Sequence, residues 1–209
     1  ADYLAAANRR AAELAMLDTT YRTANGLPPT NGKDFDITTA RDMAILARAC
    51  VQYALVMAWC GQKESRFRPG DAPRANTNKL LDRMAECDGL KTGFIRAAGF
   101  CITATAQRDG IRLISVVMGN PGKWDRFNQA QQLLETGFQS VQRVQLIAAG
   151  QPLGKPVPVS NSNVSQVQLS AAKDLWVTVR NEDMAQLKIL AEHPGTLLTP
   201  ITSGSIVGE

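Results

Sequence analysis

At 209 residues the chain is long enough to bury a sizeable core in one or two domains. Its net charge of +4 is only mildly basic and is spread along the sequence. No run of lysines and arginines is interleaved with aromatic residues, which argues against nucleic-acid binding. No stretch approaches the roughly 20 apolar residues that span a bilayer, so a transmembrane helix is not expected.

The N-terminal third predicts two helices separated by a loop. Residues 5–17 are rich in alanine and leucine and favour a helix, whereas residues 18–37 carry the Asn-Gly and Pro-Pro steps of a loop. Thr39 followed by Asp42 resembles a capping box and predicts a helix from there to about Met57. Apolar residues recur along that helix at three- and four-residue steps and predict a core stripe. They are Met43, Leu46, Ala47, Cys50, Ala54 and Met57.

The middle of the chain predicts a hairpin followed by a helix. Residues 60–79 are polar, with Gly and Pro, and suggest a loop or short hairpin above a cleft. Residues 98–107 and 111–118 are predicted strands, and the Asp-Gly step within residues 108–110 predicts the tight turn between them. A helix is predicted at 124–138. The side chains expected to pack on the sheet are Phe127, Ala130, Leu133, Leu134 and Phe138.

From about Val144 the pattern becomes all-β. Short apolar runs at 144–147, 164–169, 175–179 and 187–190 alternate with Gly, Pro, Asn and Ser. The prolines of the intervening segment cannot donate to a strand ladder, so that segment is expected at an edge or in a loop. The fold class predicted for the whole chain is α+β, with helices and an antiparallel sheet followed by a small all-β domain.

Lys91-Thr92-Gly93 is the most informative motif, because it stands directly before the predicted hairpin. On an exposed edge strand, the lysine charge would hold a substrate carboxylate and the threonine hydroxyl would donate a hydrogen bond to it. Glycine has no Cβ, so a substrate backbone can lie close to the strand. The tripeptide alone occurs by chance in many turns. Its position before the hairpin favours a substrate-binding strand.

Lys-Thr-Gly is the third of three motifs in penicillin-recognising serine enzymes, after Ser-x-x-Lys and Ser-x-Asn. Across residues 8–48, residues 88–119 and the β-rich tail, the chain resembles the D-alanyl-D-alanine carboxypeptidase family of low-molecular-mass penicillin-binding proteins. The resemblance implies that residues 1–143 are the C-terminal part of a transpeptidase-like catalytic domain. It implies that residues 144–209 are a truncated β-rich C-terminal domain.

The resemblance also assigns site residues. Lys91, Thr92 and Gly93 match the third motif and are implied to bind substrate. Arg126 lies seven residues after Gly119, where the family places an arginine that faces the cleft. A solvated arginine at the start of a helix is the alternative interpretation of Arg126. The residue after the motif is phenylalanine, whereas relatives often have a polar residue there, so the fine substrate preference is not implied.

No catalytic residue is expected within this chain. The resemblance places the nucleophilic serine, the general-base lysine and the Ser-x-Asn motif upstream of residue 1. The chain is therefore interpreted as a fragment, a processed product or an expressed piece without its N-terminal part. Ser170 and Lys173 match Ser-x-x-Lys literally, but they follow Lys-Thr-Gly and lie in a strand–turn–strand pattern. The motif requires both side chains on one helix face, so a turn is expected at 170–173.

For the parent protein the resemblance implies a serine-type carboxypeptidase that removes the terminal D-Ala from peptidoglycan stem peptides through an acyl-enzyme. Stem peptides and β-lactam antibiotics are the implied ligands, and no metal or organic cofactor is implied. The family serves cell-wall synthesis and cell shape in the periplasm or another extracytoplasmic compartment. Its members often associate peripherally with the membrane through a C-terminal helix, and this sequence stops before such a segment.

Four cysteines and one histidine complete the candidate reactive groups. None of the cysteines forms Cys-x-x-Cys, which excludes the common zinc and thioredoxin-like patterns. If a disulfide forms, Cys60 and Cys87 are the expected pair, and Cys50 and Cys101 are expected to be small buried hydrophobes. His193 precedes a Pro-Gly step, so a turn is expected there instead of a catalytic triad.

Three interpretations of function remain open at this point. The favoured one is a D-Ala-D-Ala carboxypeptidase seen in part. The second is a related peptidoglycan endopeptidase or β-lactamase, and the β-rich tail argues against a lone β-lactamase. The third is a non-catalytic cell-wall or partner-binding fragment. A chain without the N-terminal strands would expose a sheet edge and an apolar face. An ordered form is therefore expected to contain a complementing segment, a second copy or a rearrangement.

Overall fold

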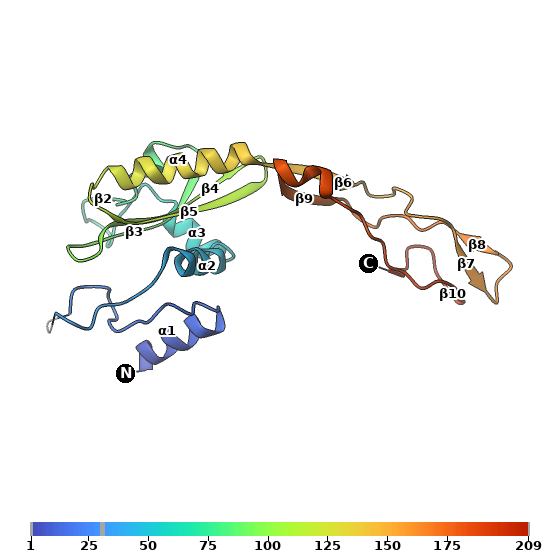
Figure 1. The fold of residues 1–209 in the computed structure, drawn as a ribbon, viewed down its shortest axis with the longest axis horizontal. Coiled ribbons are helices and arrows are strands. Elements are labelled where there is room, and N and C mark those ends of the chain that lie inside the picture. The colour runs from blue at the N-terminus through green and yellow to red at the C-terminus, as the bar shows by residue number, and fades with distance from the viewer. Residues whose placement is uncertain (1, 30–31, 209) are drawn as a thin grey trace. The chain divides into compact units, whose positions relative to one another are not determined.

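The computed structural model describes residues 2–29 and 32–208, and the chain divides into two compact units, Ala1–Gln139 and Ser140–Glu209. The first unit contains helices and a three-stranded antiparallel sheet, and the second contains short strands, turns, one 3-10 helix, η2 (Asn181–Gln186), and the last residue of an α-helix (Figure 1). This arrangement confirms the predicted α+β class.

The sheet of the first unit has the order β3-β4-β5, with β3 spanning Cys87–Ile95, β4 Gly99–Arg108 and β5 Ile111–Asn120. The predicted hairpin is confirmed. Asp109 and Gly110 form its two-residue loop with positive φ angles of 51° and 76°, the conformation that favours Asp-Gly in tight hairpins. Among the described residues β3 and β5 are the edges of this sheet.

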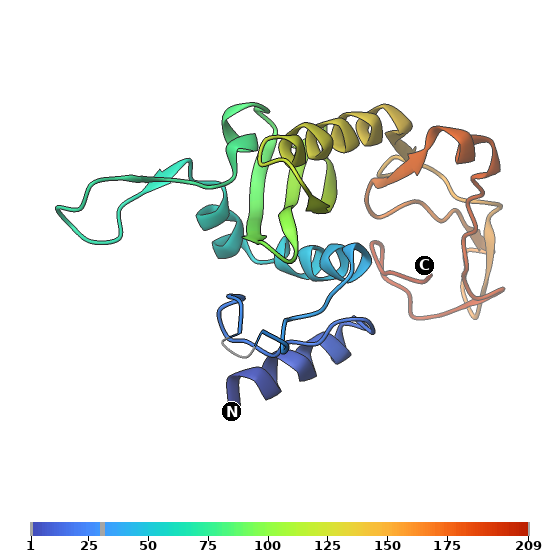
Figure 2. The ribbon, with the colours of Figure 1, turned by 60° about the vertical axis from the view of Figure 1, so that its left-hand side comes forward.

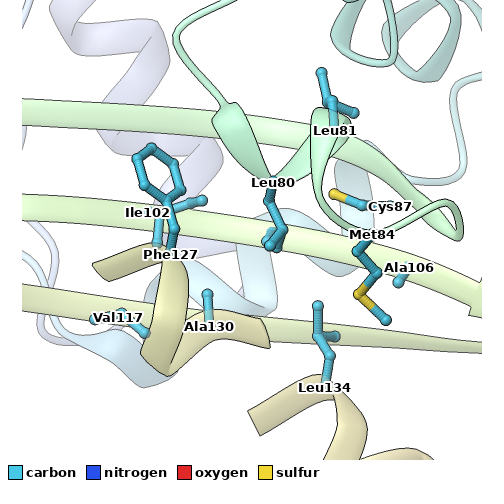
Figure 3. Close-up of a cluster of buried hydrophobic side chains, with 11 residues drawn as sticks. Leu80, Leu81, Met84, Cys87, Ile102, Ala106, Val117, Phe127, Ala130 and Leu134 are labelled. Atoms are coloured by element: carbon cyan, nitrogen blue, oxygen red, sulfur yellow. The ribbon is translucent and has the colours of Figure 1, made fainter. Parts of the chain in front are cut away.

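Helix α4, Asp125–Ser140, covers one face of the sheet (Figures 1 and 2). Its buried side chains repeat at helical spacing and meet the strands in one apolar cluster, shown in Figure 3. The cluster consists of Leu80, Leu81, Met84, Cys87, Ile102, Ala104, Ala106, Val117, Phe127, Ala130 and Leu134. Phe138 packs against it, as expected. Leu133 was expected there as well, but it is 53% exposed because its position on the helix turns it away from the sheet.

The opposite face carries α2, Ala40–Cys50, and α3, Ala54–Cys60. The predicted cap is confirmed, because the Thr39 hydroxyl accepts a hydrogen bond from the Asp42 amide. One continuous helix to Met57 was wrong: the chain bends by 112° between the two helices. The bend lets α2 contact β5 and β4 while α3 contacts β3, which one straight helix does not achieve.

The apolar stripe predicted on these helices is only partly buried. Of its six residues only Ala47 is fully buried, and Ala54 is exposed. Tyr53, Leu55 and Trp59 on α3 and just before it are 58%, 58% and 62% exposed. No single helix among the described residues is long and apolar enough to cross a membrane, and the bent α2–α3 pair passes that test only by length and composition.

Helix α1, Asp2–Glu13, is shorter at its C-terminal end than predicted, because Ala15 adopts a φ of +60° just after it. The loop that follows is tied to the start of α2 by Asp42, which is 2% exposed. The Asp42 carboxylate accepts hydrogen bonds from the Asp18 amide and the Thr19 hydroxyl, at 2.9 and 2.6 Å. These contacts fix the N-terminal segment beside α2.

The segment between α3 and the sheet forms the short hairpin that was one of two expectations for it. It consists of β1, Glu64–Ser65, and β2, Arg74–Ala75. A short 3-10 helix, η1, Lys79–Asp82, then leads to β3. The buried Asn78 caps η1 by accepting a hydrogen bond from the Leu80 amide.

The described residues of the second unit form five short strands in two small sheets, and only two of the four predicted runs, 144–147 and 175–179, form strands over their full length. One sheet pairs β6, Val141–Ile147, with β9, Leu175–Arg180. The run at 164–169 forms only the two-residue β8, Gln166–Val167. The run at 187–190 follows the 3-10 helix η2 and forms no strand. The other sheet has the order β10-β7-β8, with β7 at Val157–Ser160 and β10 at Leu197–Leu198.

Two segments of the second unit, Ser170 to Lys173 and the residues around His193, lie outside any helix, as predicted. Ser170 forms an isolated bridge with Pro152, and the residues up to Lys173 have no helical turn. His193 is exposed, and its Nδ1 lies 2.9 Å from the Pro194 carbonyl oxygen. Neither position has the geometry of a nucleophile with its base.

The Cys60–Cys87 disulfide does not form: all four cysteines are free thiols. Cys87 belongs to the cluster under α4. Cys60 lies on the other face, where a Cβ added to Gly89 would come within 3.5 Å of the Cys60 Cβ. The sheet separates the two thiols. Only Cys87 is fully buried, whereas Cys50 and Cys101 are partly exposed, contrary to expectation.

Candidate substrate-binding site

The Lys91-Thr92-Gly93 motif lies on β3, at a free edge of the sheet. Side chains alternate along the strand, so Leu90 and Thr92 are buried at 8% and 7% exposure while Lys91 and Gly93 are exposed. Thr92 pairs with Ile102 of the α4-side cluster. Lys91 therefore faces the α3 side, and a ligand that contacts both residues must lie along the edge of β3.

Lys91 lies close to the end of α3. Burial raises the pKa of the Cys60 thiol, and the positive charge of Lys91 acts against that rise. The ammonium group donates a hydrogen bond to the Thr92 carbonyl oxygen. Lys91 is thus a positive charge held at the edge of the sheet by its own strand.

Gly93 leaves open space beside the strand. A Cβ added at this position would meet no other atom within 4 Å. A ligand backbone can therefore approach β3 at Gly93 without a side chain in the way, as the sequence pattern indicated. Beyond it, the rings of Phe94 and Phe100 stack with centroids 4.1 Å apart, and Phe94 is 55% exposed. The stacked pair gives the open edge an apolar end.

The segment before η1 supports the motif from the α4 side. The hydroxyls of Thr77 and Thr92 lie 2.7 Å apart and share a hydrogen bond. The buried Asn78 amide donates to the Gly89 carbonyl at 2.9 Å. Thr77 and Asn78 were not identified from the sequence, which indicated only a polar loop or short hairpin at 60–79. These hydrogen bonds fix the side-chain rotamer of Thr92 and the position of the motif strand beside the segment before η1.

Arg126, at the start of α4, is buried at 5% exposure, so the alternative of a solvated arginine is wrong. Its Nη1 donates hydrogen bonds to the carbonyls of Gly93 and Cys101, at 3.1 and 3.2 Å. Those two residues are opposite each other on β3 and β4. The guanidinium carbon lies 5.3 Å from the Phe100 ring centroid, in cation–π geometry.

The electrostatics of Arg126 reflect this burial. Desolvation lowers the pKa of the guanidinium below its ordinary value, although arginine remains charged at neutral pH. Its Nε is buried and has no hydrogen-bond partner among the described residues. Arg126 thus places a fixed charge directly behind Gly93, and its Nε–H group is a donor without a partner among the described residues.

A second arginine anchors the start of the motif strand. Arg112 of β5 makes a bidentate pair with Asp88, with N–O distances of 2.7 and 2.8 Å. It reaches across β4, where it also donates to the Thr105 hydroxyl. The pairing register of β3 shifts between Cys87 and Gly89, and the bidentate pair holds Asp88 at this irregularity. No group of metal-ligating side chains occurs within residues 2–29 and 32–208.

Comparison with known protein families gives two matches. A family model described as "D-alanyl-D-alanine carboxypeptidase" matches residues 1–122, and one described as "Penicillin-binding protein 5, C-terminal domain" matches residues 142–209. The chain is 31% identical over 208 residues to D-alanyl-D-alanine carboxypeptidase DacC of Escherichia coli, covering 96% of the chain and 49% of the relative. It is 27% identical over 205 residues to DacF of Bacillus subtilis, covering 96% and 51%. The chain spans about half the length of the curated relatives it matches.

Solved structures give the same result. Penicillin binding protein 5 from Haemophilus influenzae superposes with a TM-score of 0.68 at 26% identity, over 99% of this chain and 59% of that one. Penicillin-Binding Protein D2 from Listeria monocytogenes, in its cefotaxime-bound form, gives 0.60 at 33% identity over 66% of this chain and 55% of that one. The PBP3 structure from Streptococcus pneumoniae, at 22% identity, shares the fold with a TM-score of 0.77 over 99% of this chain and 61% of that one.

Proposed function

The chain belongs to the D-alanyl-D-alanine carboxypeptidase family, and from that premise we propose that it supplies the substrate-binding strand of a serine-type D-Ala-D-Ala carboxypeptidase. One observation carries the proposal: the Lys-Thr-Gly motif lies on a free sheet edge, directly before the hairpin, inside the matched region. The whole enzyme would remove the terminal D-Ala from peptidoglycan stem peptides.

In the proposed complex the substrate lies along the edge of β3. Lys91 attracts the terminal carboxylate by its charge, and the Thr92 hydroxyl donates a hydrogen bond to it. Gly93 leaves room for the substrate backbone. Arg126 adds positive charge from behind the strand, where it already holds the Gly93 carbonyl. Two cations close to one carboxylate favour a free C-terminus over an amide.

The reaction itself needs residues that this chain does not provide. In the proposed enzyme a serine from the upstream part attacks the D-Ala-D-Ala peptide bond, and the lysine of its Ser-x-x-Lys motif takes the serine proton. Backbone amides, one of them on β3, stabilise the oxyanion. The leaving D-Ala departs, and water then releases the acyl-enzyme. β-Lactams would acylate the same serine, and two of the similar Listeria structures are in cefotaxime-bound and ampicillin-bound forms.

We assign residues 1–143 to the C-terminal part of the catalytic domain and residues 144–209 to the β-rich C-terminal domain. The exposed side chains of α3 and the second free sheet edge, β5, support a missing layer in the catalytic domain. A complementing N-terminal segment would cover them, and a second copy of the chain is the other candidate. The proposed compartment is the periplasm or another extracytoplasmic space, with peripheral membrane association of the full-length parent.

Labelling with a fluorescent penicillin tests the proposal. The natural protein that carries this chain is incubated with the label, and intact-protein mass locates any covalent adduct. An adduct on the protein, or on a co-purifying smaller chain, supports the serine enzyme. No adduct on a protein with intact upstream motifs would contradict it and favour a non-catalytic cell-wall protein.

Product analysis then separates the related activities. A pentapeptide ending in D-Ala-D-Ala is expected to lose one D-alanine. Cleavage of cross-linked dimers without release of D-alanine would identify an endopeptidase instead, and turnover of penicillin faster than of peptide would identify a β-lactamase.

A further inference from the structure

The hairpin between α3 and η1, residues 62–76, is the most exposed and most basic segment of the first unit, and it is called the arm below. Residues 62–75 are all exposed. Figure 2 shows the arm as the teal segment that stands clear of the sheet and helices of its unit. It carries four basic and two acidic residues, so it accounts for half of the chain's net charge of +4. The sequence had suggested that the positive charge is spread along the chain, but half of the net charge lies on the arm.

The basic side chains of the arm are not neutralised by neighbours. Within the described part of the chain, Lys63, Arg66, Arg68 and Arg74 form no ion pair. By contrast, Arg108 and Arg112 of the sheet both pair with carboxylates. Unpaired cations gathered on a projecting segment repel one another, and an anionic ligand relieves that repulsion.

An aromatic ring lies at the tip between two of these arginines. Phe67 is 80% exposed, and the Arg68 guanidinium carbon lies 5.4 Å from its ring centroid. Arg66 donates to the Asp71 carbonyl at 3.1 Å, which closes the tip. Aromatic and arginine side chains are enriched together at binding surfaces, where they offer contact area and charge.

The arm and the motif strand share one base. The Asn76 amide donates to the carbonyls of Cys60 and Gln62, at 3.1 and 2.8 Å, and so fixes both ends of the arm. The next residue, Thr77, bonds to the motif residue Thr92. A polymer that lies along β3 therefore passes the root of the arm.

We propose that the arm binds the carboxylates of neighbouring acidic peptides of the cell-wall polymer while one stem peptide occupies the β3 edge. This inference rests on the proposed function, and it extends the ligand from one terminal carboxylate to a polyanionic polymer. An anionic lipid surface is disfavoured, because Phe67 is the one exposed large apolar side chain of the arm, and membrane-lying segments present a continuous apolar face.

Co-sedimentation with purified, insoluble peptidoglycan tests the proposal, using the natural protein that carries this chain. The variant Arg66→Gln/Arg68→Gln/Arg74→Gln is expected to bind about tenfold more weakly at low salt, because three cations leave the contact. Its binding should also depend less on salt. The matched control Arg9→Gln/Arg41→Gln/Arg48→Gln removes three exposed arginines elsewhere in the unit, which likewise form no ion pair within the described residues. Its binding should stay within about twofold of the wild type.

Two further samples show what kind of interaction is involved. The variant Arg66→Lys/Arg68→Lys/Arg74→Lys keeps the charge and should retain binding within about threefold, since exposed contacts depend mainly on charge. Peptidoglycan whose carboxylates have been converted to amides should bind the wild-type protein as weakly as the glutamine variant binds the native polymer. Thermal melting confirms that each variant is folded.

The proposal is overturned if the arm variant sediments like the wild type, or if the control variant loses as much binding. It is also overturned if the arm variant keeps peptidoglycan binding but loses binding to phosphatidylcholine vesicles that contain phosphatidylglycerol, which would make the arm a lipid contact. Penicillin acylation should be equal in all variants. If the wild-type protein is not acylated by penicillin, the proposed enzyme is contradicted. The co-sedimentation result can still be interpreted in that case, because it does not depend on acylation.

Discussion

The two faces of the β3–β4–β5 sheet differ in how fully this chain covers them. Under α4, the side chains of Leu80, Ile102 and Phe127 are 0 to 1% exposed and form one apolar cluster. On the α2–α3 side, Tyr53, Leu55 and Trp59 remain more than half exposed. The α4 face of the sheet is therefore a finished core, whereas the opposite face is suited to a further layer. The motif strand lies at the boundary between the two.

The finished face should carry most of the stability of the first unit. Phe127→Ala is expected to lower the free energy of unfolding by about 3–5 kcal/mol, because a fully buried ring leaves a cavity. Urea unfolding of the purified protein measures this change. Leu133→Ala on the same helix is the matched control, and its 53% exposure predicts a change within about 0.5 kcal/mol. Equal effects of the two substitutions would contradict the contrast between the faces.

Arg126 tests whether the finished face also positions the motif. Arg126→Met removes the donor to the Gly93 and Cys101 carbonyls, and we expect a loss of about 1–3 kcal/mol, since buried acceptors lose a charged partner. Penicillin acylation of the whole protein should slow as well. Arg83→Met is the control, because the side chain of that exposed arginine bonds only to Asn128 among the described residues. Unchanged acylation in Arg126→Met would remove this arginine from the site.

Much of this architecture could be predicted from local sequence. The period of α4, the Asp-Gly turn and the Thr39 cap are local signals, and each gave the observed element. The break between α2 and α3 carries no Gly or Pro, and it follows from packing onto different strands, which no local pattern encodes. The Thr77–Thr92 contact and the separation of Cys60 from Cys87 likewise depend on how distant segments meet.

Because thiols are buried on both faces of the sheet, the free energy of unfolding should depend on pH in the alkaline range. Burial raises the pKa of Cys87 above its ordinary value of 9.0, and the pKa values of Cys50 and Cys60 rise for the same reason. Above about pH 9 the unfolded chain releases thiol protons that the folded chain retains, so the free energy of unfolding falls as pH increases. Urea midpoints measured between about pH 8 and pH 10, a window around the ordinary thiol pKa, give the slope.

The variant Cys87→Ala separates the two faces in this experiment. It is expected to flatten the pH dependence, because Cys87 is the most deeply buried of the four thiols. An unchanged slope in this variant would assign the effect to the α2–α3 side or to the Tyr21 phenol, whose pKa is also raised by burial.

The contact between Thr77 and Thr92 should have a smaller effect on stability. Thr77→Val keeps the shape but removes one hydroxyl of the pair, and the expected loss is about 0.5–1.5 kcal/mol. Thr77→Ser restores the hydroxyl and should recover most of the loss. In the whole protein, Thr77→Val should also change the preference for a free D-Ala carboxylate over its amide, because Thr92 loses its partner, and Thr77→Ser should restore that preference. A valine variant with wild-type stability and preference would show that the contact has no positioning role.

The smallest effect of a substitution on the stability of this chain alone is expected on the α2–α3 side of the sheet. Comparing that effect with the effect in a longer protein tests whether a further layer covers this side. Trp59→Ala should change stability by no more than about 0.5 kcal/mol in the 209-residue chain, because the ring is 62% exposed. In a longer protein that carries the proposed upstream segment, the same substitution should cost about 3–5 kcal/mol if that segment buries the ring. Leu17→Ala, at 84% exposure in the loop after α1, is the control in both proteins. A small effect of Trp59→Ala in both would mean that the exposed face is not covered by the upstream segment, and a second copy of the chain would then be the candidate to test by sedimentation.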